Sequence, residues 1–162
     1  MGEIIKVGMA DLKVCKAPDG LITLGLGSCV GIALRDPLTQ VGGLAHIMLP
    51  DSKAIVTSNS NKEKFADTGI EELVRQMVAM GANKNRLVAK IAGGATMFQI
   101  QSRSDIMKIG ERNVQATIAK LKELNISLLA QDTGANYGRT VTFYPESGDF
   151  HIRSIGKDNK II

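Results

Sequence analysis

The sequence predicts an α+β fold, or a layered α/β sandwich, in which a mixed, largely antiparallel sheet packs against helices. Three observations favour this class. Short β-rich runs cluster at both ends of the 162-residue chain, two stretches with helical apolar spacing lie between them, and no repeat, low-complexity segment or linker interrupts the sequence. A chain of this length can bury a sizeable core without staples, so we expect a single domain over residues 1–162.

The N-terminal third predicts five strands. Residues 3–8, 12–16 and 21–25 are short β-rich runs. The stretch 29–49 (CVGIALRDPLTQVGGLAHIML) predicts a hairpin, because two β-rich arms flank an Asp-Pro pair and proline favours a turn position. One face of this hairpin is predicted to be a core face, formed by Val30, Ile32, Leu34, Val41, Ala45 and Ile47.

The middle of the chain predicts two amphipathic helices, over 65–81 with Gly81 as its stop and over 109–125. Polar stretches at 57–64 and 99–105 predict loops. The apolar positions expected to face the core are Ile70, Leu73, Val74, Met77 and Met80 in the first helix and Val114, Ile118 and Leu121 in the second.

The remaining segments predict further strands. Residues 85–94 form a buried strand that runs into a Gly-Gly turn, and 126–132 form another. The C-terminal part predicts a hairpin of 140–145 (TVTFYP) and 149–155 (DFHIRSI).

The composition is that of an ordinary globular protein, with 44% hydrophobic and 22% charged residues. The net charge is +4, but Lys and Arg are spread along the chain and aromatic residues make up only 4%. Nucleic-acid binding usually needs a basic patch with stacking aromatics, so we expect no nucleic-acid partner.

The two cysteines, Cys15 and Cys29, are too few for a disulfide framework. The chain has two histidines and no C-x-x-C or H-x-x-x-H pair, so we expect no structural metal. No signal peptide is recognised, and the apolar stretch 21–34 is shorter than the roughly 20 residues of a bilayer span. These features predict a cytoplasmic protein with free thiols and no transmembrane segment.

The predicted hairpin brings Cys29 close to His46. If Asp36 pairs with Thr39 across the turn, Cys29 lies directly opposite His46, with the two Cβ atoms about 4.5–5.5 Å apart. A one-residue bulge would place Ile47 opposite Cys29 instead, and the sequence leaves both registers open.

A thiol beside an imidazole predicts nucleophilic chemistry. The imidazole of His46 can take the proton of Cys29 and later protonate a leaving amine. Backbone N–H groups around Gly27 and Ser28, with that of Cys29, can converge on a developing oxyanion. Gly31 and Ala33 share the predicted face with Cys29, so we expect open room beside the pair.

A third group usually orients such an imidazole, and both Thr23 and Asp51 are candidates. A structural interpretation competes with the catalytic one, because cysteine and histidine in apolar strands are often core residues. Cys15 has no partner and is interpreted as structural, and His151 is predicted to lie on the strand face opposite to its apolar neighbours.

Six segments of the chain carry a more specific signal, namely TLGLGSCVGIALRDP (23–37), VGGLAHIMLPDS (41–52), FADTGIEELVRQM (65–77), AKIAGGATMF (89–98), IGERNV (109–114) and LLAQDTGANYGRTV (128–141). Their Gly-Ser-Cys and Ala-His-x-Met-Leu-Pro elements are the most specific. Together these segments resemble the CheD family of bacterial chemoreceptor glutamine deamidases.

The resemblance implies a fold similar to bacterial toxin deamidases, with a papain-like Cys-His site. Carried over by motif, Cys29 is the nucleophile, His46 the general base and acid, and Thr23 the residue that orients the imidazole. The implied reaction converts Gln side chains on the cytoplasmic helices of methyl-accepting chemoreceptors to Glu through a Cys thioester, in chemotaxis adaptation, without metal or organic cofactor.

The same resemblance implies that some members also hydrolyse receptor methyl esters, and that a CheC-type phosphatase is the usual protein partner. Two other hypotheses stay open at this stage. The chain could be a cysteine hydrolase of another amide or thioester, or a binding module that regulates a CheC-type phosphatase with a vestigial site.

Overall fold

The computed structural model describes residues 2–52, 61–97 and 108–162. Ten strands, two α-helices and two short 3₁₀ helices are assigned within them. In chain order they are β1 (Ile4–Val7), β2 (Leu12–Lys16), β3 (Gly20–Leu26), β4 (Val30–Asp36), β5 (Val41–Ile47), η1 (Lys62–Lys64), α1 (Ala66–Ala79), η2 (Lys84–Arg86), β6 (Val88–Gly93), α2 (Ile109–Glu123), β7 (Ser127–Thr133), β8 (Arg139–Tyr144), β9 (Asp149–Arg153) and β10 (Lys160–Ile161).

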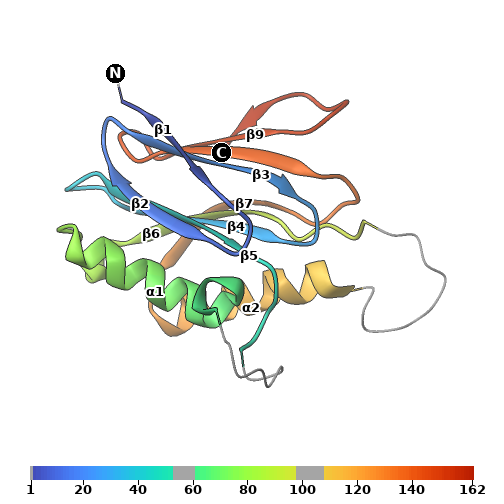
Figure 1. Cartoon of the computed structure of the whole chain (residues 1–162), viewed down its shortest axis with the longest axis horizontal. Coiled ribbons are helices and arrows are strands. Elements are labelled where there is room, and N and C mark those ends of the chain that lie inside the picture. Colours follow the sequence, from blue (N-terminus) through green and yellow to red (C-terminus); the bar gives the residue numbers. More distant parts are fainter. Residues whose placement is uncertain (1, 53–60, 98–107) are drawn as a thin grey trace.

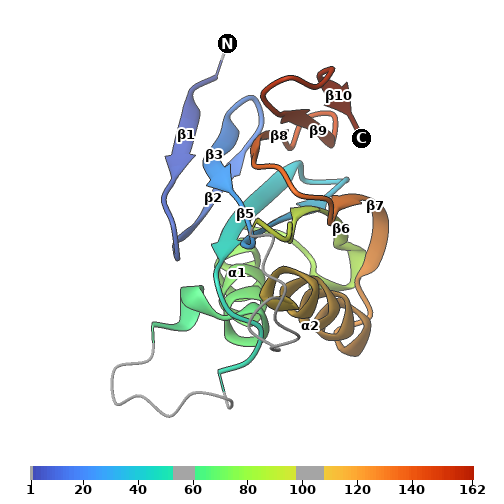
Figure 2. The ribbon, with the colours of Figure 1, turned by 90° about the vertical axis from the view of Figure 1, so that its right-hand side faces the viewer.

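The strands form two five-stranded sheets. The central sheet has the order β2-β5-β4-β6-β7, and the outer sheet has the order β1-β3-β8-β9-β10. Figure 1 shows three layers, with the central sheet between the outer sheet and the two helices. Figure 2 shows α1 and α2 side by side beneath the central sheet.

The predicted α+β class with largely antiparallel pairing is confirmed. The pairs β1–β3 and β6–β7 are parallel, and the other described strand pairs are antiparallel. The sequence did not predict that the strands divide between two sheets.

Alternation along the β4–β5 hairpin divides its side chains between two cores. One face packs on the helices, and it consists of the six predicted residues Val30, Ile32, Leu34, Val41, Ala45 and Ile47. The opposite face, which includes Cys29, Ala33 and Leu44, packs against Phe143 and Phe150 of the outer sheet. The predicted core face is therefore confirmed, and the second face forms another core.

The helix α1 buries Ile70, Leu73 and Met77 as predicted. The prediction for Met80 is wrong, since its side chain is 42% exposed. The helix ends at Ala79, and Met80 is its C-cap, so the Met80 side chain lies at the end of the helix beyond its buried face. Gly81, with φ of +115°, then turns the chain away from the helix axis.

The helix α2 turns two of its three predicted positions to the core, since Leu121 is buried and Val114 packs against the core in part. The prediction for Ile118 is wrong, because its side chain is 36% exposed. The buried line also passes through Gly110, Asn113 and Thr117, two of which are polar. These three residues are spaced three and four apart, as on one face of a helix. Hydrophobicity alone does not predict that this face is buried.

Two sequence predictions concern segments at the edges of the described ranges. The loop predicted at 99–105 and residues 57–60 of the other predicted loop lie outside the described residues. The end of that second loop, Lys62–Lys64, forms η1 rather than irregular chain.

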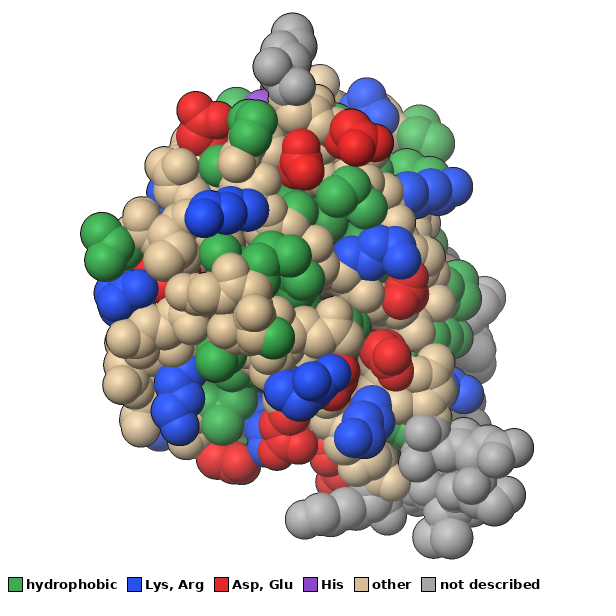
Figure 3. Space-filling model, turned by 60° about the vertical axis from the view of Figure 1, so that its left-hand side comes forward, with side chains coloured by type: hydrophobic (Ala, Val, Ile, Leu, Met, Phe, Trp, Pro, Cys, Tyr) green, Lys and Arg blue, Asp and Glu red, His purple; other side chains and the backbone are tan. Residues whose placement is uncertain are grey.

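Charged side chains of both signs are interspersed on the face of the molecule drawn in Figure 3, with hydrophobic side chains between them. Within the described part of the chain, neither α-helix has the length and apolar character that a membrane span requires.

Candidate active site

Thr23 projects from the outer sheet toward the central sheet. Along β3 the side chains of Leu21 and Thr23 are fully buried, whereas Leu24 is 45% exposed, as strand alternation requires. The pairing with β8 then shifts in register around Gly25, whose φ is +70°. This irregularity buries Leu26 and redirects the chain toward the start of β4.

His46 is fixed near the end of β5 by neighbours on both sides. Its backbone N–H donates to the Asp11 carbonyl at 2.9 Å, and its carbonyl accepts from the Ala10 N–H at 3.0 Å. On the other side, His46 pairs with Gly31 of β4. The residue is only 1% exposed, so its imidazole lies in the interior of the fold.

A short chain of hydrogen bonds determines the tautomer of His46. The Thr23 hydroxyl donates to the Val7 carbonyl at 2.8 Å, and its oxygen lies 2.7 Å from His46 Nδ1. A hydroxyl has one proton, and a carbonyl can only accept, so the Thr23 oxygen must accept from Nδ1–H. The neutral imidazole therefore carries its proton on Nδ1 and leaves the lone pair of Nε2 available as a base.

The second ring nitrogen of His46, Nε2, is buried and forms no hydrogen bond with the described residues. A buried polar atom without a partner costs stability, and a chemical role is one reason for a protein to keep such an atom. An unprotonated Nε2 can accept a proton from a thiol or from an attacking water.

The hairpin register differs from both registers considered from the sequence. Asp36 pairs with Val41, so the turn contains four residues, and Gly31 rather than Cys29 lies opposite His46. The predicted direct opposition, and the bulged alternative, are both wrong. The turn is longer because Gln40 adopts φ of +59° and closes back on the Asp36 carbonyl.

The two-residue shift keeps Cys29 and His46 on the same face, because side chains alternate with a period of two. Cys29 immediately precedes β4, and its carbonyl accepts from Gly94 N–H at 2.8 Å, so it continues the line of the strand. The thiol and the imidazole are thus diagonal neighbours, and such pairs have Cα atoms about 7–8 Å apart.

Burial favours the neutral forms of both groups. It raises the pKa of the Cys29 thiol, although the backbone N–H of Cys29 itself lowers that pKa in part. It also lowers the pKa of the His46 imidazole. A neutral thiol beside a neutral imidazole needs proton transfer to become nucleophilic, so Nε2 would act as a general base.

The expectation of open room beside the pair is wrong. Gly31 and Ala33 are buried, and a Cβ on Gly31 would meet Leu26 Cδ1 at 3.0 Å. The outer sheet covers this face of the hairpin. Cys29 itself is 8% exposed and lies at the end of the central sheet where β4 begins.

Hydrogen bonds to the carbonyl groups of Gly27 and Ser28 hold the segment that precedes Cys29. The Gly27 carbonyl accepts from Ala95 N–H at 2.9 Å, and the Ser28 carbonyl accepts from Asn113 Nδ2 at 2.9 Å. Because a carbonyl shares its peptide group with the N–H of the next residue, these bonds fix the directions of the Ser28 and Cys29 N–H groups, whereas the Gly27 N–H belongs to a peptide that neither bond holds.

Asn113 and Met97 contact this segment and were not singled out from the sequence. Met97 Cγ would lie 3.1 Å from a Cβ on Gly27, so its half-exposed side chain packs against the chain two residues before Cys29. Asn113 could have been noticed as a polar residue on the buried line of α2.

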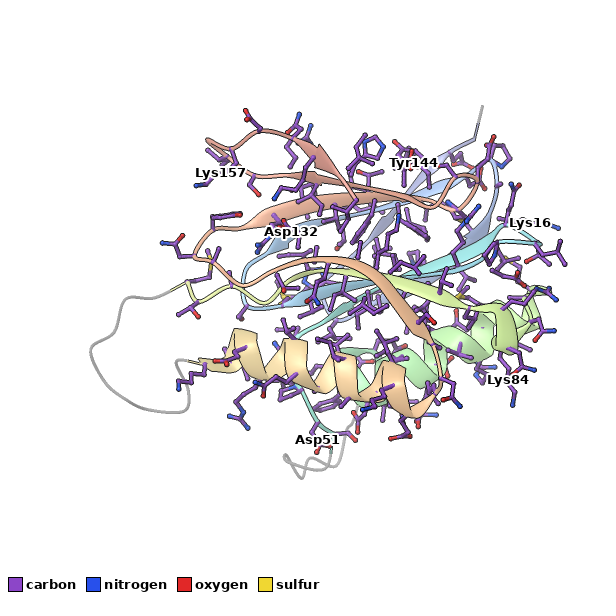
Figure 4. The ribbon with its side chains drawn as sticks, turned by 180° about the vertical axis from the view of Figure 1, so that it is seen from behind. Lys16, Asp51, Lys84, Asp132, Tyr144 and Lys157 are labelled. Atoms are coloured by element: carbon purple, nitrogen blue, oxygen red, sulfur yellow. The ribbon has the colours of Figure 1, made fainter. Side chains whose placement is uncertain are left out.

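The other candidates lie elsewhere. Asp51 is on the helix side of the central sheet, where its side chain interacts with Asp67 of α1 (Figure 4). Of the two candidates for the imidazole partner, Thr23 is therefore the one that contacts His46. Cys15, which the sequence analysis interprets as structural, is buried, and His151 is half-buried and packs on Tyr144, which Figure 4 places on the outer sheet.

Among residues 2–52, 61–97 and 108–162, no group of three or more His, Cys, Asp or Glu side chains is arranged to hold a metal ion. The arrangement around His46 is a different one. A thiol and an imidazole on one sheet face, with the imidazole oriented by a hydroxyl, are the groups that thiol-dependent hydrolases use, although no hydrogen bond joins Cys29 Sγ to His46 Nε2.

Comparison with known proteins indicates the family to which this chain belongs. The family model described as CheD chemotactic sensory transduction matches residues 48–154. Over the full length of both chains, the sequence is 60% identical to a protein of Lachnoclostridium phytofermentans named "Probable chemoreceptor glutamine deamidase CheD". It is 47% identical over the full length of both chains to a Halalkalibacterium halodurans protein named "Chemoreceptor glutamine deamidase CheD".

The chain belongs to the CheD family, as the sequence motifs predicted. A third relative, from Caldanaerobacter subterraneus, is 58% identical, and the match covers 99% of this chain and 98% of the relative. Among solved structures, the Bacillus licheniformis hypothetical protein YfiH matches with a TM-score of 0.40 at 16% identity, over 75% of this chain and 52% of that chain.

Proposed function

We propose that this chain is a chemoreceptor glutamine deamidase that uses Cys29 as nucleophile, His46 as general base and acid, and Thr23 as the residue that orients the imidazole. One observation carries the proposal. The bond from His46 Nδ1 to a Thr23 hydroxyl already committed to Val7 leaves Nε2 unprotonated, on the face that also carries Cys29. The names of the full-length relatives supply the substrate class.

In the first half-reaction, Nε2 of His46 takes the thiol proton as Cys29 Sγ attacks the side-chain carbonyl carbon of a glutamine. A C–S bond forms, and the carbonyl oxygen becomes an oxyanion that the N–H of Cys29 can stabilise. The tetrahedral intermediate collapses when the imidazolium returns its proton to the departing nitrogen. Ammonia leaves, and a thioester to Cys29 remains.

In the second half-reaction, water attacks the thioester carbon while His46 Nε2 takes one of its protons. The C–S bond breaks, the sulfur recovers its proton from the imidazolium, and a glutamate side chain is released. Throughout the cycle the Thr23 oxygen accepts from Nδ1–H, so the positive charge on the imidazolium is stabilised on that side.

The burial of the site suits a long, thin substrate side chain. Cys29 is 8% and His46 1% exposed, so a bulky backbone segment cannot approach the thiol directly. A glutamine on a helix surface extends its amide away from the backbone. Such a side chain can enter at the end of the sheets, with Met97 at the entrance providing apolar contact for the neighbouring helix surface.

The same proposal covers the setting of the enzyme. We infer that one deamidase domain spans the chain, that it acts in the cytoplasm on the helical cytoplasmic part of methyl-accepting chemoreceptors, and that a CheC-type phosphatase is its protein partner. Hydrolysis of receptor glutamate methyl esters by the same thioester route is a second activity to be assayed.

Intact-mass spectrometry of a chemoreceptor cytoplasmic fragment tests the proposal. With wild-type protein, each modified site should gain about 1 Da, localised to glutamine by peptide mapping, with ammonia released in equal amount. The variant Cys29→Ala should give no gain. Cys15→Ala is the matched control, because it removes the other buried thiol and should leave deamidation intact.

A receptor fragment that binds the wild-type protein but shows no mass gain would favour the binding-module hypothesis instead. A mass gain that persists with Cys29→Ala would exclude the thiol mechanism.

A further inference from the structure

We propose that Asn113 is a positioning residue that fixes the peptide group carrying the Cys29 N–H and ties the nucleophile segment to the strand that carries the base. The inference rests on the proposed deamidase function for its kinetic part. It starts from a buried amide on α2 that takes no part in the proton transfers or bond changes of the proposed reaction.

Asn113 is fully buried, and its two Nδ2 protons are both used on the backbone of the site. One bond of 2.9 Å goes to the Ser28 carbonyl, immediately before the nucleophile. The other, of 3.0 Å, goes to the Met48 carbonyl, two residues after His46. No other orientation of the amide is acceptable, because a flipped amide would set its oxygen against two carbonyl oxygens.

These two bonds lie where the backbone ladder between β4 and β5 stops. The last residue pair of that ladder is Val30 with Ile47, and the two chains separate beyond it. The Asn113 side chain spans the gap with its own two donors. It therefore replaces the ladder at the point where Cys29 and Met48 would be the next pair.

The bond to Ser28 also orients the candidate oxyanion donor. The Ser28 carbonyl and the Cys29 N–H belong to one planar trans peptide, so they point in opposite directions. Since the carbonyl points to α2, the N–H points away from the helix layer, toward the region between the sheets. This direction agrees with the contact of that N–H with the Cys29 sulfur, which lowers the thiol pKa.

A close glycine contact brings α2 near enough for this role. A Cβ on Gly110 would clash with the Ala95 carbonyl oxygen, and a Cβ on Gly94 would lie 2.8 Å from the Gly110 carbonyl oxygen. The first turn of α2 thus sits against the segment that follows β6. One turn later, Asn113 reaches Ser28 and Met48.

Asn113 also carries a structural cost that simple packing does not explain. Its Oδ1 is buried and has no hydrogen-bond partner among the described residues. An apolar side chain of similar size would avoid this unsatisfied oxygen. The side chain is therefore accounted for by its two donors rather than by its fit to the core.

The test uses Asn113→Asp, which keeps the shape of the side chain, and Asn113→Leu, which keeps its approximate size but has no donor. Thr117→Val is the matched control. Thr117 is equally buried on the same helix, and its hydroxyl donates to the Asn113 carbonyl of the helix backbone rather than to Ser28 or Met48. All proteins are assayed well below their measured Tm.

We expect kcat for receptor deamidation to fall about 10²-fold in both Asn113 variants, with KM nearly unchanged, since alignment and not substrate contact is lost. The ratio of wild-type to Asn113→Asp activity should shrink as the pH is lowered. The carboxyl introduced by Asn113→Asp can donate one of the two bonds when it is protonated, whereas its ionised form faces two carbonyl oxygens and donates none.

A second readout does not depend on deamidation. Mass-resolved alkylation of Cys29 as a function of pH should show its midpoint moved to higher pH in Asn113→Leu, because the N–H that lowers the thiol pKa is no longer held in place. Thr117→Val should leave the midpoint where it is in the wild type. If wild-type protein does not deamidate receptor, the proposed function fails, and the alkylation midpoint still tests the role of Asn113.

The inference is overturned if Thr117→Val loses as much kcat as the Asn113 variants, or if the Asn113 variants lose activity through KM alone. It is also overturned if the alkylation midpoint is the same in Asn113→Leu and wild type.

Discussion

Replacing Thr23 with valine would remove a hydroxyl while nearly preserving the shape of the side chain. The structure defines what is lost. The hydroxyl donates to the Val7 carbonyl at 2.8 Å and accepts from His46 Nδ1–H at 2.7 Å. Thr23 has no exposed surface, so both bonds are buried. In Thr23→Val, the Val7 carbonyl and Nδ1 of His46 are both left in the core without that partner.

Two magnitudes follow. Each unsatisfied buried group costs about 1–3 kcal/mol of the free energy of unfolding, so the variant should have a lower Tm and urea midpoint. Loss of a bond of the same strength to Nδ1–H lowers the ratio of the Nδ1–H tautomer to the Nε2–H tautomer about 5–150-fold. The fraction of imidazole with a free Nε2 falls by less than this ratio, so we expect kcat for deamidation to fall several-fold, with KM little changed.

Steady-state deamidation of a receptor fragment, followed by ammonia release, measures the effect. Thr23→Ser is the control, because it keeps the hydroxyl and should retain kcat within about threefold of wild type. If Thr23→Val kept the wild-type kcat, the Nδ1–H tautomer would not depend on Thr23, and the assignment of Nε2 as the base would lose its support.

Two further predictions concern ionisation. Burial lowers the pKa of His46 from its ordinary value of 6.5, and protonation of the imidazole removes the base as the pH falls. The acid limb of the pH profile of kcat/KM should therefore have its midpoint below pH 6.5, and a midpoint above 6.5 would contradict the direction of the pKa shift. Below pH 7, iodoacetamide followed by peptide mapping should label Cys29 at least about tenfold faster than Cys15, whose pKa burial and Asp19 raise to about 11; equal rates would contradict the assignment of Cys29 as the activated thiol.

The sequence predicted the local elements well because their signals are local. Alternation marked the β4–β5 arms, and helical spacing marked α1 and α2. The register of the β4–β5 hairpin was predicted wrongly, because it depends on the length of the turn. Gln40 at φ of +59° lengthens the turn, and no glycine or asparagine marked that position.

The face shared by Cys29 and His46 was predicted even though the register was wrong. The observed register differs from the directly opposed one by two residues, and side-chain direction repeats every two residues. A one-residue error would have separated the two side chains, whereas the two-residue error changed opposite neighbours into diagonal ones. A prediction that two side chains share a sheet face therefore holds when the register is wrong by an even number of residues.

The cover over the site could not be predicted, because it depends on which strands pair across the whole chain. Residues 4–7 and 20–26 join strands from the C-terminal part to form the outer sheet. That sheet turns the expected open face into a core. It also supplies Thr23, so the covering and the orientation of His46 have the same origin.

The proposed site is consequently assembled from all three layers. The outer sheet contributes Thr23 and the Val7 carbonyl, the central sheet contributes His46 and leads into Cys29, and the helix layer contributes Asn113. Each layer packs on the next through an apolar core, so the relative positions of the site groups are fixed by burial over the entire fold. Loosening either core should therefore reduce alignment before it unfolds the chain, and core variants distant from Cys29 should lower kcat more than KM.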